Sequence, residues 1–397
     1  MAAFKFTVLQ EDATSSARLG ELVTRRGCIE TPYFVPVATL ASVRALGSDD
    51  LATLGAQCVL ANAYYLHIKP GDELINGLGG LHQFMGFERP IITDSAGFQA
   101  FSLGFGREHN ISKIGSIFPD GRASSEKREN LTRITDEGIH FKSAHDGAWR
   151  FLDARSSMEI QANLGADIIM AFDECTSPLS DYEYTRRAME RTHEWAGHSL
   201  RYHDRSQAIY GIIQGGWFED LRHESTAFIT ALPFDGIAIG GSLGNSKSDM
   251  HQVLEWVVPR LDERPRHLLG IGEIEDIFAC VERGIDSFDC VAPTRLARRG
   301  NLLISPDSGG SLENKYRISI KSGKYKADPG PIEPGCACST CERYSRAYLR
   351  HLYTVNELAY FRLASIHNLH FMFRLMALIR ASIRDGTLGD LKRKWLQ

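Results

Sequence analysis

Short runs of apolar residues recur along the chain, and most of them are followed closely by Gly, Asp, Asn or Pro. A short apolar run that is bounded by turn formers is typical of a strand buried on both faces. Eight such strands are predicted, at residues 33–38, 58–61, 90–93, 167–171, 208–213, 236–239, 267–270 and 287–290.

The segments between most of these strands have helical spacing. Ser156 and Glu159 match the S-x-x-E capping box, which predicts a helix N-terminus at Ser156. A second helix is predicted from Ser180 onward through Met189 and Trp195. Strands that alternate with helices indicate a parallel sheet, and their number favours a closed (β/α)8 TIM barrel over an open, doubly wound sheet.

Polar side chains and glycines follow several of the predicted strands. Active sites of (β/α)8 barrels lie at the carboxyl ends of the strands. A single Asp there is more often a helix cap or a turn residue, but several such groups at one rim favour a site. Phe98 is placed to stack on a flat ring and Gln99 to bond the edge of that ring. The strand-end groups are Asp94, Asp173, Gln214, Gly240-Gly241 and Asp289.

These residue types indicate carboxylate chemistry. Neither G-x-x-x-x-G-K-[ST] nor H-E-x-x-H occurs in the sequence, and histidines do not gather at the strand ends, which disfavours a metallohydrolase. One carboxylate can attack an anomeric carbon while another transfers a proton. This is the logic of retaining glycosyl transfer, in which an acceptor attacks a covalent sugar–enzyme intermediate.

Three thiols fall within six residues, at Cys336, Cys338 and Cys341. Thiolates in one short loop are suited to Zn²⁺, which needs a fourth ligand for tetrahedral coordination. With four protein ligands the site would be closed, so the zinc would hold local structure and would not activate water. The spacing leaves three candidates for the fourth ligand: His351, His367 and His370.

The overall charge is close to neutral, since 45 Lys+Arg oppose 49 Asp+Glu for a formal net charge of -4. As an average, this value argues against an evenly basic nucleic-acid binder. Residues 291–397, however, hold 18 Lys+Arg and 8 Asp+Glu, a balance of 18 − 8 = +10, and the preceding 290 residues carry 27 − 41 = −14. This asymmetry predicts an anionic partner on the basic side. The other cysteines are isolated along the chain, which is not typical of a secreted disulfide framework. No apolar run is long enough to span a membrane, and the N-terminus lacks the apolar core of a signal peptide, so a cytoplasmic protein is predicted.

Six motifs occur along the chain: D-S-A-G-F-Q from Asp94, F-D-E-C from Phe172, Q-G-G from Gln214, I-G-G from Ile239, F-D-C-V-A-P-T-R from Phe288, and the C-x-C-x-x-C cluster. Together they resemble tRNA-guanine transglycosylase (the queuine tRNA-ribosyltransferase family) over about residues 20–388. The resemblance implies a (β/α)8 barrel with a zinc-binding subdomain near the C-terminus, and a homodimer. It also implies exchange of the wobble guanine in tRNAs for Asn, Asp, His and Tyr (GUN anticodons) for a 7-deazaguanine base, which leads to queuosine.

The resemblance implies roles for single residues. Asp289 matches the nucleophile that attacks ribose C1′ and forms a covalent tRNA intermediate, and Asp94 matches the general acid/base. The positions that match the base-binding set are Ser95, Phe98, Asp173, Gln214, Gly241 and Leu269. Contacts to tRNA are expected from Arg295, Arg298 and Arg299. One structural zinc ion per chain is expected at Cys336, Cys338, Cys341 and His367.

The sequence departs from the family's pattern in three places. Ala96 stands where Gly is usual, a change expected to tighten the pocket. The polar segment 104–132 is longer than in the family and is predicted to be either a flap over the tRNA or a passive insertion. After Gly241 the chain reads S-L-G-N-S-K, without the Glu that meets the cationic amine of the incoming base. Because losing a charge-assisted partner costs on the order of 1.5–3 kcal/mol, queuine competes with 7-aminomethyl-7-deazaguanine as the predicted base.

The predicted domains are the barrel at 1–300, closed by a helix within 368–397, and the zinc-binding subdomain at 301–367. One alternative function is insertion of uncharged 7-cyano-7-deazaguanine, typical of archaeal members with additional C-terminal RNA-binding domains, for which this chain leaves no room. Others are action on another nucleic acid and a role as a non-catalytic partner subunit. The last is disfavoured because Asp94, Asp173 and Asp289 are all present.

Overall fold

The computed structural model describes residues 4–98, 132–143 and 145–397. The predicted segment 104–132 therefore lies outside the described residues except for Thr132, and Gln99 lies outside them as well. Among the helices of the described residues, none is both long and apolar enough to cross a membrane.

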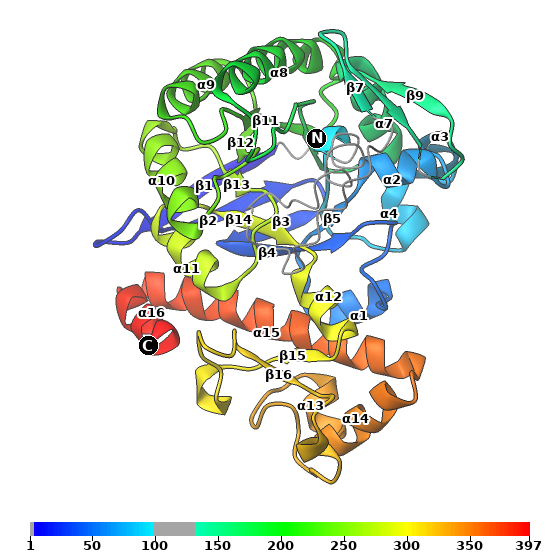
Figure 1. Cartoon of the computed structure of the whole chain (residues 1–397), viewed down its shortest axis with the longest axis vertical. Helices are drawn as coiled ribbons and strands as arrows, with labels where there is room; N and C mark the ends of the chain where they lie inside the picture. The colour runs from blue at the N-terminus through cyan, green and yellow to red at the C-terminus, as the bar shows by residue number, and fades with distance from the viewer. Residues whose placement is uncertain (1–3, 99–131, 144) are drawn as a thin grey trace. The chain divides into compact units, whose positions relative to one another are not determined.

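Eight strands form a closed barrel in the order β10-β11-β12-β13-β14-β4-β5-β6, which confirms the predicted fold (Figure 1). Neighbouring strands pair in parallel, as in Ile213↔Ile239 between β11 and β12. Each strand lies within two residues of its predicted bounds, because both faces of a barrel strand are buried and leave a continuous apolar run. The strands are β4 (Tyr33–Ala38), β5 (Val59–Ala61), β6 (Ile91–Thr93), β10 (Ile168–Met170), β11 (Ala208–Ile213), β12 (Gly236–Ile239), β13 (Arg266–Leu268) and β14 (Ser287–Cys290).

Three further sheets were not predicted from the sequence. The strands β1 (Lys5–Glu11), β2 (Arg18–Thr24) and β3 (Gly27–Thr31) form one of them. A second contains β7 (Thr132–Ile134), β8 (Ile139–Lys142) and β9 (Trp149–Leu152), and a third contains β15 (Asn301–Leu303) and β16 (Arg317–Ser319). Some of these strands leave no continuous apolar run, because β1 exposes five of its seven residues and β9 exposes two of its four.

The chain divides into two compact units. The first comprises residues up to Phe6, Leu22–Cys28 and Leu60–Leu269. The predicted capping box is wrong in detail: Asp153 caps α7, and Ser156 is the third helical residue, whose hydroxyl closes the box. The predicted helix after Ser180 is confirmed as α8. The helices of this unit are α2 (Ala63–Ile68), α3 (Asp72–Gly77), α4 (Gly80–Met85), α7 (Ala154–Leu164), α8 (Tyr182–Tyr202), α9 (Glu219–Ala231) and α10 (Lys247–Val257).

The second unit comprises Thr7–Glu21, Ile29–Val59 and Gly270–Gln397. Its longest helix, α15 (Leu358–Arg384), packs against α12, α13, α14 and β15 (Figure 1). Its other helices are α1 (Ser48–Thr53), α11 (Ile274–Glu282), α12 (Ala292–Arg298), α13 (Ser339–Arg343), α14 (Arg346–Thr354) and α16 (Leu388–Leu396). The division into a barrel at 1–300 and a zinc-binding subdomain at 301–367 stays a prediction.

A buried ion pair anchors β2 next to β14. Arg18 binds Asp286 with both arms, through Nε–Oδ1 at 2.9 Å and Nη2–Oδ2 at 2.6 Å, and both side chains are buried. We expect Arg18→Met to lower the free energy of unfolding by about 3–5 kcal/mol, because the carboxylate is left buried without its cation. Urea denaturation measures this change. The exposed pair Arg155–Glu159 is the control, and Arg155→Ala should leave the transition midpoint where it is; equal midpoints for both variants would contradict the prediction.

Candidate functional site

Asp94 follows β6 directly and is held by three donors within the first unit. Its Oδ1 accepts from the backbone N–H of Ala63 at 2.9 Å and of Ala96 at 3.3 Å. Its Oδ2 accepts from Nδ2 of Asn62, whose own Oδ1 caps α2 by accepting from the N–H of Tyr65. Asn62 therefore ties the orientation of Asp94 to the start of a helix. The sequence analysis missed Asn62, although it directly follows the predicted strand 58–61.

Asp173 follows β10 and is buried, with two side chains donating to its carboxylate. Ser95 Oγ donates to Oδ1 at 2.8 Å, and Gln214 Nε2 donates to Oδ2 at 2.7 Å. At Gly97, an added Cβ would lie 2.5 Å from the carbonyl oxygen of Asp173, so this close approach requires glycine. The structure thus brings together three of the predicted base-binding residues, Ser95, Asp173 and Gln214, in one hydrogen-bonded group.

Gln214 also packs directly on the Gly pair that follows β12. A Cβ added to Gly241 would lie 2.1 Å from Gln214 Oε1, and the φ of Gly241 is +78°. Gln214 Oε1 is buried and accepts no hydrogen bond from a described residue. A buried polar atom without a partner is costly, so this oxygen indicates a place where a bound ligand or water completes the network.

Arg222 of α9 lies behind these two loops, and its side chain is fully buried. Its guanidinium donates to four backbone carbonyls: Nε to Gly216 at 2.8 Å, Nη1 to Ile213 at 3.1 Å, and Nη2 to Gly240 at 3.1 Å and to Ser242 at 2.8 Å. Burial lowers the pKa of Arg222 to about 10, so the group stays a cation at neutral pH. The sequence analysis missed Arg222; its signal was a charged residue on the buried stripe of α9.

The remaining base-binding candidates, Phe98 and Leu269, are each half-buried. Leu269 follows β13, and its Cδ1 would lie 3.7 Å from a Cβ added to Gly240. Ala96 is buried with a φ of +69°, a left-handed conformation that glycine adopts more readily. This conformation gives a physical reason for the glycine that the family resemblance leads one to expect at this position.

The loop after Gly241 contains no carboxylate before Asp249. The Oδ2 of Asp249 accepts from the N–H groups of Asn245, at 2.7 Å, and Ser246, at 3.1 Å. Ser246 caps α10 in return, because its Oγ accepts from the N–H of Asp249. The nearest following carboxylate is therefore engaged in holding the loop to its helix.

In the second unit, Asp289 is the third residue of β14, and its Oδ1 accepts from the N–H of Gly270 at 3.0 Å. The neighbouring Cys290 is another nucleophile type on this strand. Desolvation raises the pKa of the Cys290 thiol to about 11, so it stays protonated at neutral pH and is a poor nucleophile. The carboxylate of Asp289 is thus the better nucleophile of the two.

The predicted tRNA-binding arginines lie at the C-terminal end of α12: Arg295 and Arg298 in its last turn, and Arg299 as its C-cap. Partial burial and the neighbouring guanidinium groups of Arg44, Arg295 and Arg299 lower the pKa of Arg298. Four like charges are therefore gathered in one place. An anionic partner would relieve their mutual repulsion.

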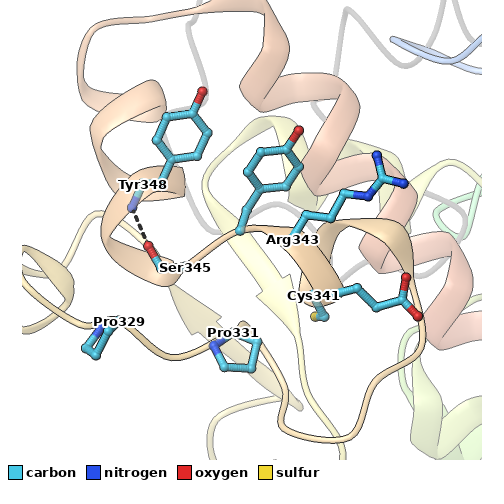
Figure 2. A pocket seen from close by; sticks show the side chains of 8 residues that line it. Pro329, Pro331, Cys341, Arg343, Ser345 and Tyr348 are labelled. Carbon is cyan, nitrogen blue, oxygen red and sulfur yellow. Dashed lines mark hydrogen bonds between the residues drawn. The ribbon is translucent and has the colours of Figure 1, made fainter.

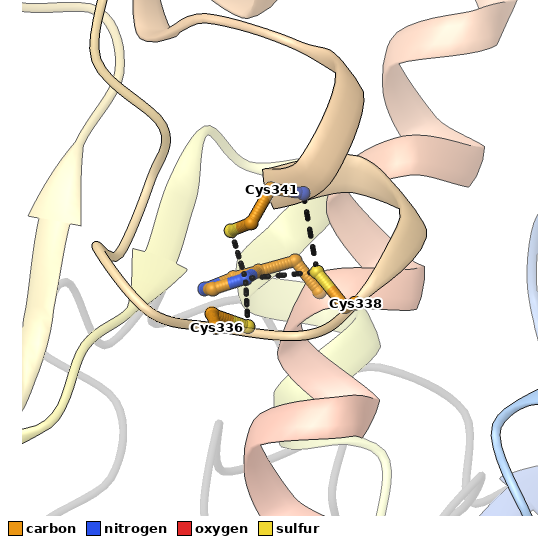
Figure 3. A group of neighbouring side chains, drawn as sticks. Cys336, Cys338 and Cys341 are labelled. Atoms are coloured by element: carbon orange, nitrogen blue, oxygen red, sulfur yellow. Dashed lines mark hydrogen bonds between the residues drawn. The ribbon is translucent and has the colours of Figure 1, made fainter.

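The three predicted thiols meet in one buried cluster with His367 (Figure 3). One ligand atom from each of the four residues lies within 4.8 Å of the others, and His367 Nδ1 is 3.3 Å from Cys341 Sγ. Three thiols and one imidazole at such distances fit a tetrahedral metal ion. The cysteines come from the loop before α13 and from its first turns, and His367 comes from α15.

A contact behind His367 favours Nδ1 as its metal ligand. His367 Nε2 lies 2.7 Å from the carbonyl oxygen of Leu303, so Nε2 carries the proton and Nδ1 presents a lone pair to the sulfur atoms. The helices α14 and α15 fold back on one another and bring His367 to the loop. His370 Nδ1 is 3.5 Å from Cys336 Sγ alone, and neither His370 nor His351 belongs to the four-residue group.

A separate pocket of about 590 Å³ lies beside this cluster (Figure 2). The rings of Tyr344 and Tyr348 stack there at 5.4 Å between centroids, next to Arg343 and Glu342. Tyr348 is 43% exposed, and two nearby apolar residues in the sequence, Val355 and Leu358, are 56% and 77% exposed. This part of the second unit therefore presents apolar groups to solvent.

Comparison with known proteins gives consistent matches over the whole chain. Residues 12–397 match the family described as "Queuine tRNA-ribosyltransferase". A protein from Archaeoglobus fulgidus is 54% identical over 387 residues, which is 96% of each chain. The queuine tRNA-ribosyltransferase of Roseiflexus sp. is 42% identical over 98% of each chain, and that of Symbiobacterium thermophilum is 42% identical over 100% of this chain and 91% of its own.

Proposed function

Because this chain belongs to the queuine tRNA-ribosyltransferase family, we propose that it exchanges the wobble guanine of tRNA for a 7-deazaguanine base. Family membership makes it an enzyme, a pentosyltransferase. The observation that carries the proposal is the hydrogen-bonded group of Ser95, Asp173 and Gln214 at the strand ends, packed against Gly241.

This group suits one edge of a guanine-like ring. The carboxylate of Asp173 can accept hydrogen bonds from the ring N–H and the exocyclic amine of the purine. The second hydrogen of Gln214 Nε2 and the N–H of Gly241 can donate to the purine carbonyl. Phe98 and Leu269 are proposed to cover the two faces of the ring. When a wrong base binds, the buried polar groups of such a site are left without hydrogen-bond partners. The site therefore discriminates strongly against that base.

Two carboxylates carry the proposed chemistry. An oxygen of Asp289 attacks C1′ of the ribose, and the glycosidic bond breaks with its electron pair going to guanine, which Asp94 protonates. Asp94 then takes a proton from the incoming base, whose nitrogen attacks C1′ and expels the Asp289 carboxylate. Two displacements leave the configuration at C1′ unchanged. The donors on Asp94 hold the carboxylate in one orientation for both proton transfers.

The substrate is proposed to be tRNA with a GUN anticodon, the type that reads Asn, Asp, His and Tyr codons. The arginines of α12, joined by Arg44, offer bidentate donors to phosphate oxygens. A zinc ion held by Cys336, Cys338, Cys341 and His367 would fix the surrounding loop and helices and, with four protein ligands, would take no part in the reaction. A homodimer stays a prediction.

The identity of the incoming base depends on the loop after Gly241. With Asp249 engaged at the start of α10, the loop supplies no carboxylate for a cationic 7-aminomethyl group. We propose queuine as a substrate alongside 7-aminomethyl-7-deazaguanine, and 7-cyano-7-deazaguanine, whose uncharged nitrile needs no carboxylate, is the alternative. A non-catalytic partner subunit is disfavoured by the three carboxylates and their donors.

Substitution of the proposed nucleophile tests the reaction. Asp289→Ala should lower incorporation of labelled guanine into unmodified tRNA of the Asn, Asp, His or Tyr type by at least about 10³-fold, because no covalent intermediate can form. Wild type should form a tRNA adduct on denaturing gels that the variant lacks. The matched control is Asp307→Ala, an exposed carboxylate that pairs with Lys394. Absence of incorporation by wild type would contradict the function, and unchanged turnover in Asp289→Ala would contradict the nucleophile.

Competition among guanine, queuine, 7-aminomethyl-7-deazaguanine and 7-cyano-7-deazaguanine tests base choice. We expect the aminomethyl base to have no advantage over the cyano base in wild type. Asn245 is exposed, and Asn245→Glu would place a carboxylate in the loop, so the ratio of aminomethyl to cyano incorporation should rise on the order of tenfold. Asn245→Gln is the neutral control. A strong aminomethyl preference in wild type would refute this account of the loop.

The metal cluster is tested by metal analysis of the purified protein. One zinc per chain is expected, and Cys338→Ser should lose it and become sensitive to protease around residues 329–345, since the metal holds the loop. The control Cys28→Ser, far along the chain from the cluster, should retain zinc. Full zinc retention in Cys338→Ser would count against this ligand set.

A further inference from the structure

Arg222 joins the two loops that carry Gln214 and Gly241. Its guanidinium reaches the carbonyl of Ile213, just before Gln214, and the carbonyls of Gly240 and Ser242, on either side of Gly241. A buried cation is costly unless its donors are satisfied. Each nitrogen of this guanidinium donates to a carbonyl oxygen, so the orientation of these backbone groups is coupled to one rigid, planar side chain.

The bond to Gly240 fixes the direction of the next N–H. The Gly240 carbonyl and the Gly241 N–H belong to one peptide unit, and in a trans peptide they point in opposite directions; the only cis peptides among the described residues precede Pro32 and Pro70. Because the Gly240 carbonyl points at Arg222, the Gly241 N–H points away from it. A carbonyl that binds a cation also polarises its own peptide unit, which makes the N–H a stronger donor.

We propose that Arg222 is a positioning residue for base recognition, which orients and polarises the Gly241 N–H so that it donates to the carbonyl of a 6-oxopurine. The inference rests on the proposed function, because it takes the purine as the ligand. Ser225, one turn further along α9, supports the same loop, since its Oγ accepts from the backbone N–H of Gln214 at 3.1 Å. The first half of α9 thus holds both groups that meet the purine carbonyl.

A second arginine provides a matched control for a purely structural role. Arg264 donates to the carbonyls of Thr230, Leu232 and Phe234, around the C-terminal end of the same helix. Like Arg222, it ties loop carbonyls to α9, but these carbonyls precede β12, whereas those of Gly240 and Ser242 follow it. Loss of either arginine should destabilise the fold, and only loss of Arg222 should alter recognition of the purine carbonyl.

The experiment compares Arg222→Lys with Arg264→Lys in binding guanine and 2-aminopurine, which lacks the carbonyl and the adjacent ring N–H; since each purine is compared with its own wild-type Kd, the missing N–H affects variant and wild type alike. In Arg222→Lys we expect the Kd and KM for guanine to rise about tenfold, the Kd for 2-aminopurine to change less than about twofold, and the KM for tRNA to stay unchanged. Lysine keeps the charge but not the planar fork. Arg264→Lys should leave the guanine to 2-aminopurine ratio at its wild-type value. An unchanged guanine Kd in Arg222→Lys, or an equal loss for both purines, would overturn the proposal.

If Arg222→Lys does not fold, a measurement on the wild-type protein still tests whether the Gly241 N–H donates to the purine carbonyl, as the proposal requires. Guanine should slow hydrogen exchange at the Gly241 amide, and 2-aminopurine should leave it unchanged, because only guanine offers a carbonyl acceptor. Equal protection by both purines, or protection by neither, would reject the role of this N–H. These binding and exchange measurements do not need turnover. Failure of the proposed transglycosylation would appear as absent guanine incorporation into tRNA, and it is therefore distinguishable from failure of the Arg222 inference.

Discussion

The position of each candidate side chain in the first unit depends on the backbone hydrogen bonds between parallel strands. Pairs such as Met170↔Tyr210 and Ile213↔Ile239 fix where neighbouring strands stand relative to one another. Asp173, Gln214 and Gly241 follow these strands by one to three residues, so the register of the sheet sets the spacing of the polar groups. A shift of one residue would turn the side chains of the preceding strands to the opposite face and displace the residues that follow.

The polar groups at these strand ends form one network in which each member limits the others. Asp173 is buried and takes donors from Ser95 and Gln214, while Gln214 packs against Gly241. The positive charge of Arg222 lies behind the Gly241 loop, where the guanidinium donates to the backbone carbonyls of Gly240 and Ser242. The donors of Arg222 are thus engaged by backbone carbonyls, and Asp173 accepts from the neutral side chains of Ser95 and Gln214. In a region of low dielectric such networks are strong when complete and costly when one partner is missing.

The sequence was sufficient for the barrel and for most of the candidate residues, for a physical reason. Strands buried on both faces give continuous apolar runs, and the residues after them are easily read as site candidates. The exposed strands β1 and β9 carry no such signal. Asp153 and Ser156 both fit a capping position, and only the backbone geometry decides between them. Arg222 left only the signal of a charge on the buried stripe of α9, because its partners are backbone carbonyls, which the residue pattern does not reveal. The choice of His367 depended on the fold of α14 and α15, and came from the family resemblance.

The net charge of the chain is the sum of regions with different environments. In the first unit, Asp173 lies among donors that suit a neutral, hydrogen-bonding ring. In the second unit, partial burial and the neighbouring guanidinium groups of Arg44, Arg295 and Arg299 lower the pKa of Arg298. In the absence of a ligand, the repulsion between these arginines destabilises the fold. An anion that binds there lowers the free energy, because its negative charge removes this repulsion. The repulsion that destabilises the free protein therefore favours binding of a polyanionic partner. Salt screens the arginines, so it should reduce both the destabilisation and the affinity for that partner.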